Sequence, residues 1–490
     1  MLGRRWQVLS ALVLGLAALS GALAPQGLAP LDGRGGTALA LDRTVETCEW
    51  AAFKEALDAI QADGGGTLTL DCDGVIDYAA EQTIATDVKL VGVGEVTFDG
   101  NESTRFFNVA ATGSLELVNL TLWRGSVPAD QDGGAIAADG DLTITASRFI
   151  DNQAHDGGAI AITGSSVLTV SDSTFSGNHA TNSGGAILYQ SDASWSISRS
   201  TFNDNEADTG GAIYAAQASE LTISASTFTE NRTDFGGGGI AIGSGAVEIV
   251  GSTLVDNQAG TQGGAIWVGS TATLTITASI VAGNSAEQDG DNCFILPFAT
   301  YASGGYNLSD DDSCGFVEEG DIQNSAHIDL GPLTDNGGPT LTRMPQLTSD
   351  AVDKVPCNLT TPQDQRGFTR PTDGLDCEIG AVEVGMLSQA VTLCANRFTG
   401  LLAATLAGGG CPSGSVALSL PGEQPTTICI HASSGQLSWA ARGTCSSAQY
   451  AHSVPGDGPL AYCEHAYTGK LRYSRTGTCS PVERPGVIPG

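Results

Sequence analysis

Residues 142–152 have the sequence LTITASRFIDN, and the pattern of these eleven residues returns five more times along the chain. Each copy holds two apolar residues one position apart, then a Ser, an apolar residue and an Asn. Successive Asn residues are 26 or 27 positions apart, at Asn152, Asn178, Asn205, Asn231, Asn257 and Asn284. A repeat with a period of roughly 20 to 50 residues is typical of solenoids and arrays.

The composition of each copy favours a β-solenoid. Apolar residues alternate with Thr, Ser and Glu, as in Leu168-x-Val170 and Leu274-x-Ile276, which is the periodicity of strands. A Gly-Gly-(Ala/Gly)-Ile turn precedes each strand run and ends at Ile136, Ile160, Ile187, Ile213, Ile240 and Ile266. The period leaves room for three short strands and three bends. The pattern therefore predicts an all-β fold, a right-handed parallel β-helix with coils about 4.8 Å apart.

The repeated residues are expected to stack in columns along this solenoid. Stacked Asn amides can hydrogen-bond from coil to coil, and Asn also tolerates the left-handed conformation found in bends. A Ser stands five residues before each Asn, at Ser147, Ser173, Ser200, Ser226, Ser252 and Ser279. An internal apolar column is expected from Phe149, Phe175, Phe202, Phe228, Leu254 and Val281. The spacing varies after each turn Ile, where insertions are expected to bulge outward.

The chain is predicted to contain five segments: a signal peptide (1–40), a cap with the first coils (41–110), the β-helix repeats (111–335), a C-terminal part of the β-helix (336–386) and three Cys-paired modules (387–490). Arg4 and Arg5 precede an apolar run that ends near Leu23, which indicates a secretory signal. Cleavage could follow Ala24 or Ala40, and a retained anchor is the alternative. No later stretch holds about 18 apolar residues, so no further membrane span is predicted. The expected location is secreted or cell-surface.

A short helix is predicted in front of the first coil. Trp50, Phe53, Leu57 and Ile60 follow helical spacing, and the pattern stops at residues 64–66, which are all Gly. An exposed end of a solenoid is an aggregation-prone edge, so this helix is expected to cover it as a cap.

The chain has twelve Cys, an even number that indicates disulfides in an exported protein. Within residues 387–490 the Cys recur at intervals of 34 or 35, which predicts three small modules, each a hairpin closed by its own bridge. Cys429-x-His431 and Cys463-x-His465 leave a zinc site as the less favoured alternative, since Asn396 stands at the matching position of the first module. The expected pairs are Cys48–Cys72, Cys293–Cys314, Cys357–Cys377, Cys394–Cys411, Cys429–Cys445 and Cys463–Cys479.

The repeats resemble those of polymorphic outer-membrane proteins and other pectin-lyase-like β-helices. Later motifs are similar to the ending of choice-of-anchor Q domain proteins: DNC (291–293), GYNL (305–308), CGF (314–316), LGPLTDNGGPT (330–340), DQRG (364–367) and CEIGAVE (377–383). Ala351-Val352-Asp353-Lys354 stands where that group usually has Pro-Ala-Ile-Asp, a mild departure. The resemblance covers roughly residues 45–385. It implies a bacterial exported protein that ends in a surface-anchoring device, in a group whose members mostly have no known activity. The modules in 387–490 are similar to short Thr-Gly-x-Leu modules of bacterial surface proteins.

The formal net charge of −33 is unevenly placed, with 49 acidic and 12 basic residues in 42–385. Such an acidic body disfavours nucleic acid and anionic membranes as partners. Its simplest role is solubility. The sharper alternative is Ca²⁺ binding, which prefers clustered oxygen ligands. The candidate ligands flank the expected Cys293–Cys314 bridge and are Asp289, Asp291, Asp310 and Asp312. No other cofactor is expected.

A ligand-contact surface is predicted on the residues that follow the turn Ile, because neighbours alternate across a strand. These residues are Ala137, Ala161, Leu188, Tyr214, Ala241 and Trp267. Leu188, Tyr214 and Trp267 would form a partly apolar stripe that could stack sugar rings or receive a peptide strand. The alternative is that an inserted loop covers the stripe.

Catalysis is the less favoured function. Hydrolysis of a glycosidic bond would need two carboxylates at a set separation, and elimination would need a calcium-binding acidic cluster with a nearby base. Asp132 and Asp156 lie on turns where polar residues are ordinary, and His155 and His179 show no partner pattern. The sequence therefore predicts a non-catalytic exported β-helix that contacts an extracellular glycan, matrix or cell-surface component. The alternative is a calcium-dependent polysaccharide lyase or glycosidase. The oligomeric state is left open.

Overall fold

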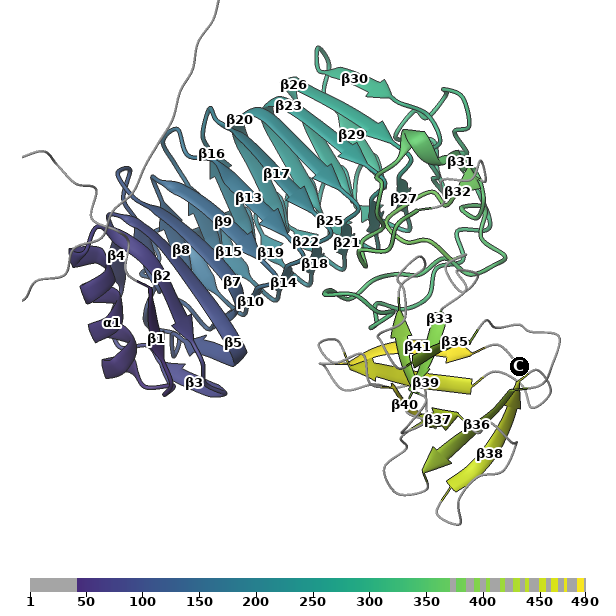
Figure 1. Ribbon diagram of the computed structural model, residues 1–490. Coiled ribbons are helices and arrows are strands. Elements are labelled where there is room, and N and C mark those ends of the chain that lie inside the picture. Colours follow the sequence, from purple (N-terminus) through teal and green to yellow (C-terminus); the bar gives the residue numbers. More distant parts are fainter. Residues whose placement is uncertain are drawn as a thin grey trace, which may run out of the picture. The chain divides into compact units, whose positions relative to one another are not determined.

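The computed structural model describes residues 42–370 and 376–384, apart from the side chains of Ala218 and Ser219, together with the backbone of nine strands between residues 392 and 488 (Figure 1). The predicted signal peptide lies outside the described residues. Among those described, no helix has the length and apolar content needed to cross a membrane.

The described body is a parallel β-solenoid, which confirms the predicted fold class. The turn Ile opens the strands β8 (Ile136–Ala138), β12 (Ile160–Ile162), β16 (Ile187–Gln190), β20 (Ile213–Ser224), β23 (Ile240–Val250) and β26 (Ile266–Thr277). The Leu-x-Ile pattern continues these last three strands, but forms separate strands in earlier coils: β9 (Asp141–Thr145), β13 (Leu168–Ser171) and β17 (Ser194–Ser198). Strands of one kind pair in parallel from coil to coil, as Leu168 does with Leu142 and Trp195.

Two further strands complete each coil. The Phe strands are β10 (Arg148–Ile150), β14 (Thr174–Ser176), β18 (Thr201–Asn203), β21 (Thr227–Thr229), β24 (Thr253–Val255) and β27 (Ile280–Ala282). The strands after the Asn are β11 (Gln153–Asp156), β15 (His179–Ser183), β19 (Glu206–Ala207), β22 (Arg232–Thr233), β25 (Gln258–Ala259) and β28 (Ser285–Ala286), which form a second parallel sheet. Each coil thus presents three faces to its surroundings.

A ladder of Asn side chains runs inside the solenoid. The Asn178 Oδ1 accepts hydrogen bonds from the backbone N of Asn152 at 3.1 Å and from its Nδ2 at 2.9 Å, and the same pair of bonds recurs at Asn205, Asn231, Asn257 and Asn284. Each Nδ2 also donates to a carbonyl of the preceding coil, as Asn178 does to Phe149 O. The ladder ends where Asn292 accepts from Asn284. These bonds satisfy buried polar groups that would otherwise be costly.

The left-handed bend lies one residue before each Asn rather than at the Asn itself. Asp151, Asp204, Glu230 and Asp256 have φ between 52° and 60°, and Gly177 and Gly283 take the same place in their coils. The Asn side chain is buried and fully hydrogen-bonded, so its backbone stays in an ordinary conformation. The expectation that Asn supplies the left-handed residue was therefore wrong by one position.

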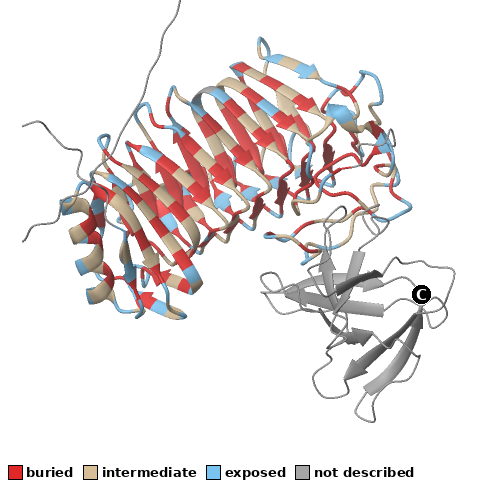
Figure 2. Ribbon diagram, in the orientation of Figure 1, coloured by how far each residue is buried: buried red, intermediate tan, exposed pale blue. Residues whose placement is uncertain are grey.

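The apolar column inside the Phe strands consists of stacked rings. Phe149, Phe175, Phe202 and Phe228 lie with ring centroids 4.8, 4.7 and 4.6 Å apart and interplanar angles of at most 5°. Leu254 and Val281 continue the column in register. All six side chains are buried, and Figure 2 shows the regular alternation of buried and less buried residues along the coils.

The first coils are less regular, and the helix α1 (Trp50–Ala62) covers their open end (Figure 1). Phe53, Leu57 and Ile60 are buried against the coil, and a disulfide joins Cys48 to Cys72. The early strands are β1 (Arg43–Val45), β2 (Gly65–Leu70), β3 (Gly74–Asp77), β4 (Gln82–Ile84), β5 (Asp87–Asp99), β6 (Phe107–Val109) and β7 (Ser114–Trp123). The helix begins and ends close to the predicted positions because the Gly run stops it.

Variable spacing after the turn Ile is absorbed in two ways. In the early coils a loop separates β12 from β13 and β16 from β17. In the later coils β20, β23 and β26 run on without a break, and the extra residues become register shifts at Ala218–Glu220 and Ile242–Ser244. The predicted outward bulges are therefore only partly present as loops, since a β-bulge accommodates one extra residue within a strand. The coils end with β29 (Cys293–Ile295) and β30 (Thr300–Ser303), beside the Cys293–Cys314 disulfide.

Residues 340–370 and 376–383 are here called the return segment. They add no further coil and instead pack against the outward side of the Phe strands. Gln365 Nε2 donates to the hydroxyl of Thr201 at 2.8 Å, and its Oε1 accepts from the hydroxyl of Thr227 at 2.5 Å. The backbone N of Ala381 donates to the hydroxyl of Thr253 at 3.1 Å. The segment contains β31 (Val355–Pro356), a 3-10 turn η1 (Cys357–Leu359), β32 (Asp376–Cys377) and the Cys357–Cys377 disulfide. The expectation that residues 336–386 extend the β-helix is corrected accordingly.

Each C-terminal module is a three-stranded antiparallel sheet rather than a two-stranded hairpin. The strands are β33 (Thr392–Asn396), β34 (Leu402–Thr405) and β35 (Ser415–Leu418); β36 (Thr426–His431), β37 (Leu437–Trp439) and β38 (Gln449–Val454); and β39 (Leu460–His465), β40 (Leu471–Tyr473) and β41 (Glu483–Ile488). The first strand of each module is central. The expected bridges Cys394–Cys411, Cys429–Cys445 and Cys463–Cys479 involve side chains outside the described residues, so they stay predictions.

Candidate functional site

One outward-facing column of residues varies strongly from coil to coil, and it includes the predicted ligand contacts. The residue after each turn Ile pairs directly with its counterpart in the next coil, which places Ala137, Ala161, Leu188, Tyr214, Ala241, Trp267 and Phe294 in one line. We call this line the outward column. Its strands lie side by side along one side of the solenoid (Figure 1). Because side chains alternate across a strand, the column points away from the buried turn Ile residues that precede it.

Tyr214 and Trp267 both lean toward the coil that lies between them. A Cβ atom built at Gly236 would lie 2.9 Å from Trp267 Cδ1, and one built at Gly243 would lie 3.1 Å from the Tyr214 hydroxyl oxygen. Both glycines belong to the coil of Ala241, which is 0% exposed. The small residues of this coil thus leave room for both aromatic side chains, one on each side of Ala241 along the strand.

The predicted contacts differ in how much surface they offer. Tyr214 and Trp267 are half-buried, whereas Leu188 is only 5% exposed and therefore presents little area to a ligand. The stripe remains a prediction, centred on the two aromatic residues.

Two aromatic residues near this surface were missed in the sequence. Phe294 is half-buried and pairs with Trp267, 27 residues earlier, but its coil has Gly290-Asp291-Asn292-Cys293 in place of the Gly-Gly-Ala-Ile turn. The period alone would have found it. Phe235 is 56% exposed and directly precedes Gly236, the glycine that Trp267 approaches. Nothing in the repeat predicts an aromatic residue there.

Tyr214 in the outward column is influenced by Asp156, which lies in the turn before Ile160. Burial raises the pKa of the Tyr214 hydroxyl, and the negative charge of Asp156 raises it further. The phenol therefore stays protonated at all ordinary pH values and can act as a hydrogen-bond donor. A donor beside an apolar surface suits a ligand with both apolar faces and oxygen acceptors.

Asp132, His155 and Asp156 form a cluster at that turn. His155 Nδ1 lies 3.1 Å from Asp156 Oδ2 and 3.6 Å from Asp132 Oδ1. Asp132 and Asp156 each precede the two glycines of their turns, and Gly133 N donates to the Asp156 carbonyl oxygen at 2.9 Å, which holds the two coils in register. His155 was expected to lack partners, and the structure corrects this. Its partners come from two different coils, which no local pattern reveals.

The Asp156 carboxylate affects the protonation of Asp132. Burial raises the pKa of Asp132, and the neighbouring Asp156 raises it further, while His155 opposes the shift. Asn182 Nδ2 donates to the second oxygen of Asp156 at 2.8 Å, so that carboxylate is oriented from the next coil. The cluster thus combines one possible nitrogen ligand of a metal ion with two possible oxygen ligands.

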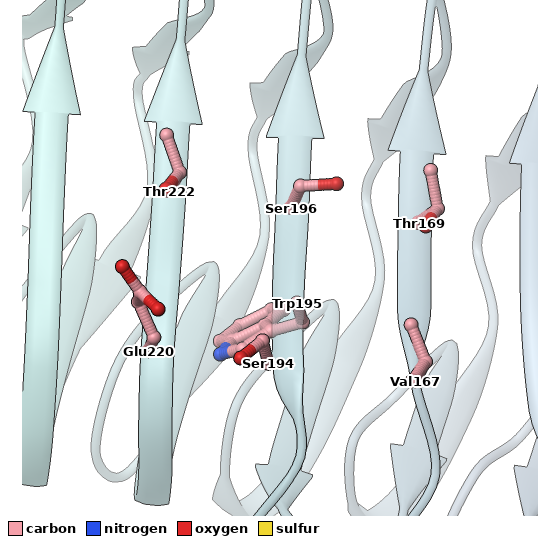
Figure 3. A pocket seen from close by; sticks show the side chains of 7 residues that line it. All are labelled: Val167, Thr169, Ser194, Trp195, Ser196, Glu220 and Thr222. Atoms are coloured by element: carbon pink, nitrogen blue, oxygen red, sulfur yellow. The ribbon is translucent and has the colours of Figure 1, made fainter.

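A shallow depression lies further along the same strands, over their Leu-x-Ile parts. Thr169, Ser196 and Thr222 form one row across neighbouring strands, and Val167, Ser194 and Glu220 form a second row (Figure 3). Trp195 lies beneath them and stacks on Tyr189 at 4.2 Å. The lining contains a single carboxylate, so it lacks the carboxylate pair that glycoside hydrolysis requires.

The four predicted calcium ligands do not meet as one group. Asp291 accepts a hydrogen bond from Ala286 N at 3.0 Å, and Asp310 accepts from Gly283 N at 2.9 Å and from Asn292 Nδ2 at 2.8 Å. These carboxylates therefore help to finish the Asn ladder at its last coil. Asp289 and Asp312 lie nearby in the chain, on the turns around the Cys293–Cys314 bridge. Within the part of the chain that the structure describes, one group of three or more His, Cys, Asp or Glu residues has ligand atoms close enough to share a metal ion. It consists of Asp132, His155 and Asp156.

Comparison with known proteins supports the fold and leaves the activity open. No curated protein and no solved structure shows significant similarity to the chain. A family model described as "Right handed beta helix region" matches residues 108–316, which span the repeats, the outward column and the Asp132–His155–Asp156 cluster. The chain is therefore an all-β protein built on a right-handed parallel β-helix.

Proposed function

We propose that this protein is an exported, non-catalytic β-helix that contacts an extracellular glycan through the outward column. The observation that carries the proposal is the line of half-buried aromatic residues in the outward column, in which Tyr214 and Trp267 lean over the coil of Ala241 and Phe294 comes next. Exposed apolar surface bordered by polar residues commonly marks an interaction site. Aromatic side chains supply a large contact area with a polar atom at one end, which fits the faces and hydroxyls of a sugar ring.

The negative charge of residues 42–385 disfavours one class of glycan ligand. Residues 42–385 carry 49 acidic and 12 basic side chains, which would repel a polyanionic polysaccharide. A neutral or amino-sugar-containing glycan is therefore the proposed ligand. The apolar run after Arg4 and Arg5 and the disulfides in the described body support an exported protein, and the resemblance to choice-of-anchor Q domain proteins supports a place at a bacterial cell surface.

The test is a glycan array on the full mature chain, followed by affinity measurements on the best neutral glycan. Trp267→Ala is expected to weaken binding about tenfold or more, since a central aromatic contact commonly supplies ~1.4 kcal/mol or more. Tyr214→Ala is expected to weaken it as well. Trp123→Ala is the matched control, because Trp123 is a half-buried Trp on a Phe-strand face that packs beneath Arg124.

Analysis of the glycan after incubation separates the two functional classes. An intact glycan supports a binding protein, whereas shortened chains would support the alternative, a polysaccharide lyase or glycosidase. Equal binding by the wild type, Trp267→Ala and Trp123→Ala would rule out the outward column as the contact surface.

A further inference from the structure

The Asp132–His155–Asp156 cluster is a local departure from the repeat. The residue before the two turn glycines is Asp132 or Asp156 in its two coils, but in the next four coils it is Ser183, Thr209, Gly236 and Gln262. The solenoid therefore does not require a carboxylate at this position. Two successive Asp residues beside a His need an explanation other than the fold.

The separations within the cluster match those of atoms that share a metal ion. Zinc binds His nitrogen and carboxylate oxygen at about 2.0 to 2.2 Å, so two ligand atoms around a tetrahedral ion are about 3.4 Å apart. The distances from His155 Nδ1 to Asp156 Oδ2 and to Asp132 Oδ1, 3.1 and 3.6 Å, lie on either side of this value. All three ligand atoms lie within 4.8 Å of one another.

The cluster also has an excess of negative charge. Among the described residues no Lys or Arg forms an ion pair with Asp132 or Asp156. The nearby Arg105 instead pairs with Glu81 and donates to the main-chain oxygens of Asp132 and Gly133. Two carboxylates held together beside His155, with no Lys or Arg of the described chain paired to them, form a site that a cation would stabilise.

We propose that Asp132, His155 and Asp156 bind a divalent transition-metal ion, with Zn²⁺ as the preferred species. Imidazole nitrogen with two carboxylate oxygens suits zinc better than Ca²⁺ or Mg²⁺, which prefer oxygen ligands alone. Three protein ligands leave one position of a tetrahedral ion for water or a ligand atom. Asn182, which donates to the free oxygen of Asp156, is a positioning residue in this site. The proposal does not depend on glycan binding.

The experiment is a Zn²⁺ titration of the chelator-treated full mature chain by calorimetry, together with Co²⁺ absorption spectra. His155→Ala is expected to remove one Zn²⁺ equivalent and the visible bands of tetrahedral Co²⁺. Asp156→Asn is expected to weaken the site strongly, and Asn182→Ala is expected to weaken it about tenfold, as is usual for residues that orient a ligand. The difference between variant and wild type cancels any metal held by the C-terminal Cys and His residues.

His179→Ala is the matched control, since His179 lies one coil further along, in β15, and is expected to leave the titration unchanged. Melting curves in the presence of chelator should coincide for all variants, because the three side chains are partly exposed. Equal Zn²⁺ stoichiometry in wild type and His155→Ala would overturn the proposal. So would complete displacement of Zn²⁺ by an equal concentration of Ca²⁺, which would indicate a site formed by carboxylates alone.

Discussion

Residues inside the coils repeat from one coil to the next, whereas residues on the outer surface of the same coils vary. Inside, an Asn and an apolar residue return in every coil, with stacked rings 4.6 to 4.8 Å apart and one repeated hydrogen-bond pattern. Outside, the outward column changes from Ala161 to Leu188, Tyr214, Ala241 and Trp267. A residue that repeats is explained by stacking. A residue that breaks the repeat at an equivalent position is a candidate for function, because the fold accepts other residues there.

The largest expected loss of stability comes from a cavity within the stack of Phe rings. Phe202→Ala should lower the free energy of unfolding by about 3–5 kcal/mol, since the cavity is enclosed by Phe175 and Phe228 and cannot collapse without shifting a coil. Phe202→Leu should cost far less, because Leu254 fills the same column two coils later. Urea unfolding followed by circular dichroism measures both. Equal losses for the two variants would contradict the stacking account.

The next effect concerns the Asn ladder. Asn205→Ala should lower the free energy of unfolding by about 2–4 kcal/mol, because two donors of Asn178 would lose their acceptor inside the solenoid. Asn203→Ala is the control, since Asn203 is a half-buried Asn two residues earlier, at the end of β18, whose side chain donates to the Ser176 hydroxyl. It should cost less than about 1 kcal/mol. A control as destabilising as Asn205→Ala would mean that the ladder has no special role.

A smaller loss of stability is expected from a substitution beside Trp267 in the outward column. Gly236→Ala should cost about 1–2 kcal/mol, since its new methyl group would displace the Trp267 ring and approach the Gln262 carbonyl oxygen at 3.0 Å. The fluorescence of Trp267 should change with it, measured as the difference from the same pair of proteins carrying Trp267→Phe. Gly331→Ala, whose nearest neighbour would be 3.4 Å away, should leave both stability and fluorescence unchanged. Unchanged Trp267 fluorescence in Gly236→Ala would contradict the inference that Gly236 makes room for the indole ring.

The smallest effect depends on pH and lies in the return segment. Burial raises the pKa of Glu378 above its usual value of 4.5. In the folded protein the ionised form is therefore disfavoured, so stability contributed by this group is present below pH 4.5 and is lost as the pH rises through the raised pKa. Glu378→Gln should remove that loss. Urea unfolding of both proteins between pH 4 and 7 measures the difference, which should grow with pH; a constant difference would contradict the assignment.

The interior could be predicted from the sequence because every interior position is repeated. The period located Asn152 and Phe149 and their counterparts, and the Gly run after Ile60 located the end of the cap helix. Each coil carries the same short pattern, which would be a weak signal if it occurred once. Because it recurs in every coil, these few residues are enough to predict the solenoid. The left-handed bend was misplaced by one residue because Asp and Asn are both common at bends, and the sequence does not tell which of the two side chains is buried.

The candidate sites were harder to predict because they join different coils. His155 meets Asp132 across a coil boundary, and Trp267 packs on Gly236, 31 residues earlier. Such contacts depend on the register of the coils and on the direction in which a long side chain leans, and neither is visible in a local motif. The return segment escaped prediction for a similar reason, since Gln365 bonds to Thr201 across 164 residues.

The return segment also decides where the solenoid would bear mechanical load. Gln365 and Ala381 hold the coils of Thr201, Thr227 and Thr253, which lie in the middle and later part of the solenoid rather than at its final turn. Tension transmitted through the residues after Glu383 would therefore reach several coils side by side, in shear. Peeling from an end breaks one coil at a time, whereas this attachment requires several bonds to fail together.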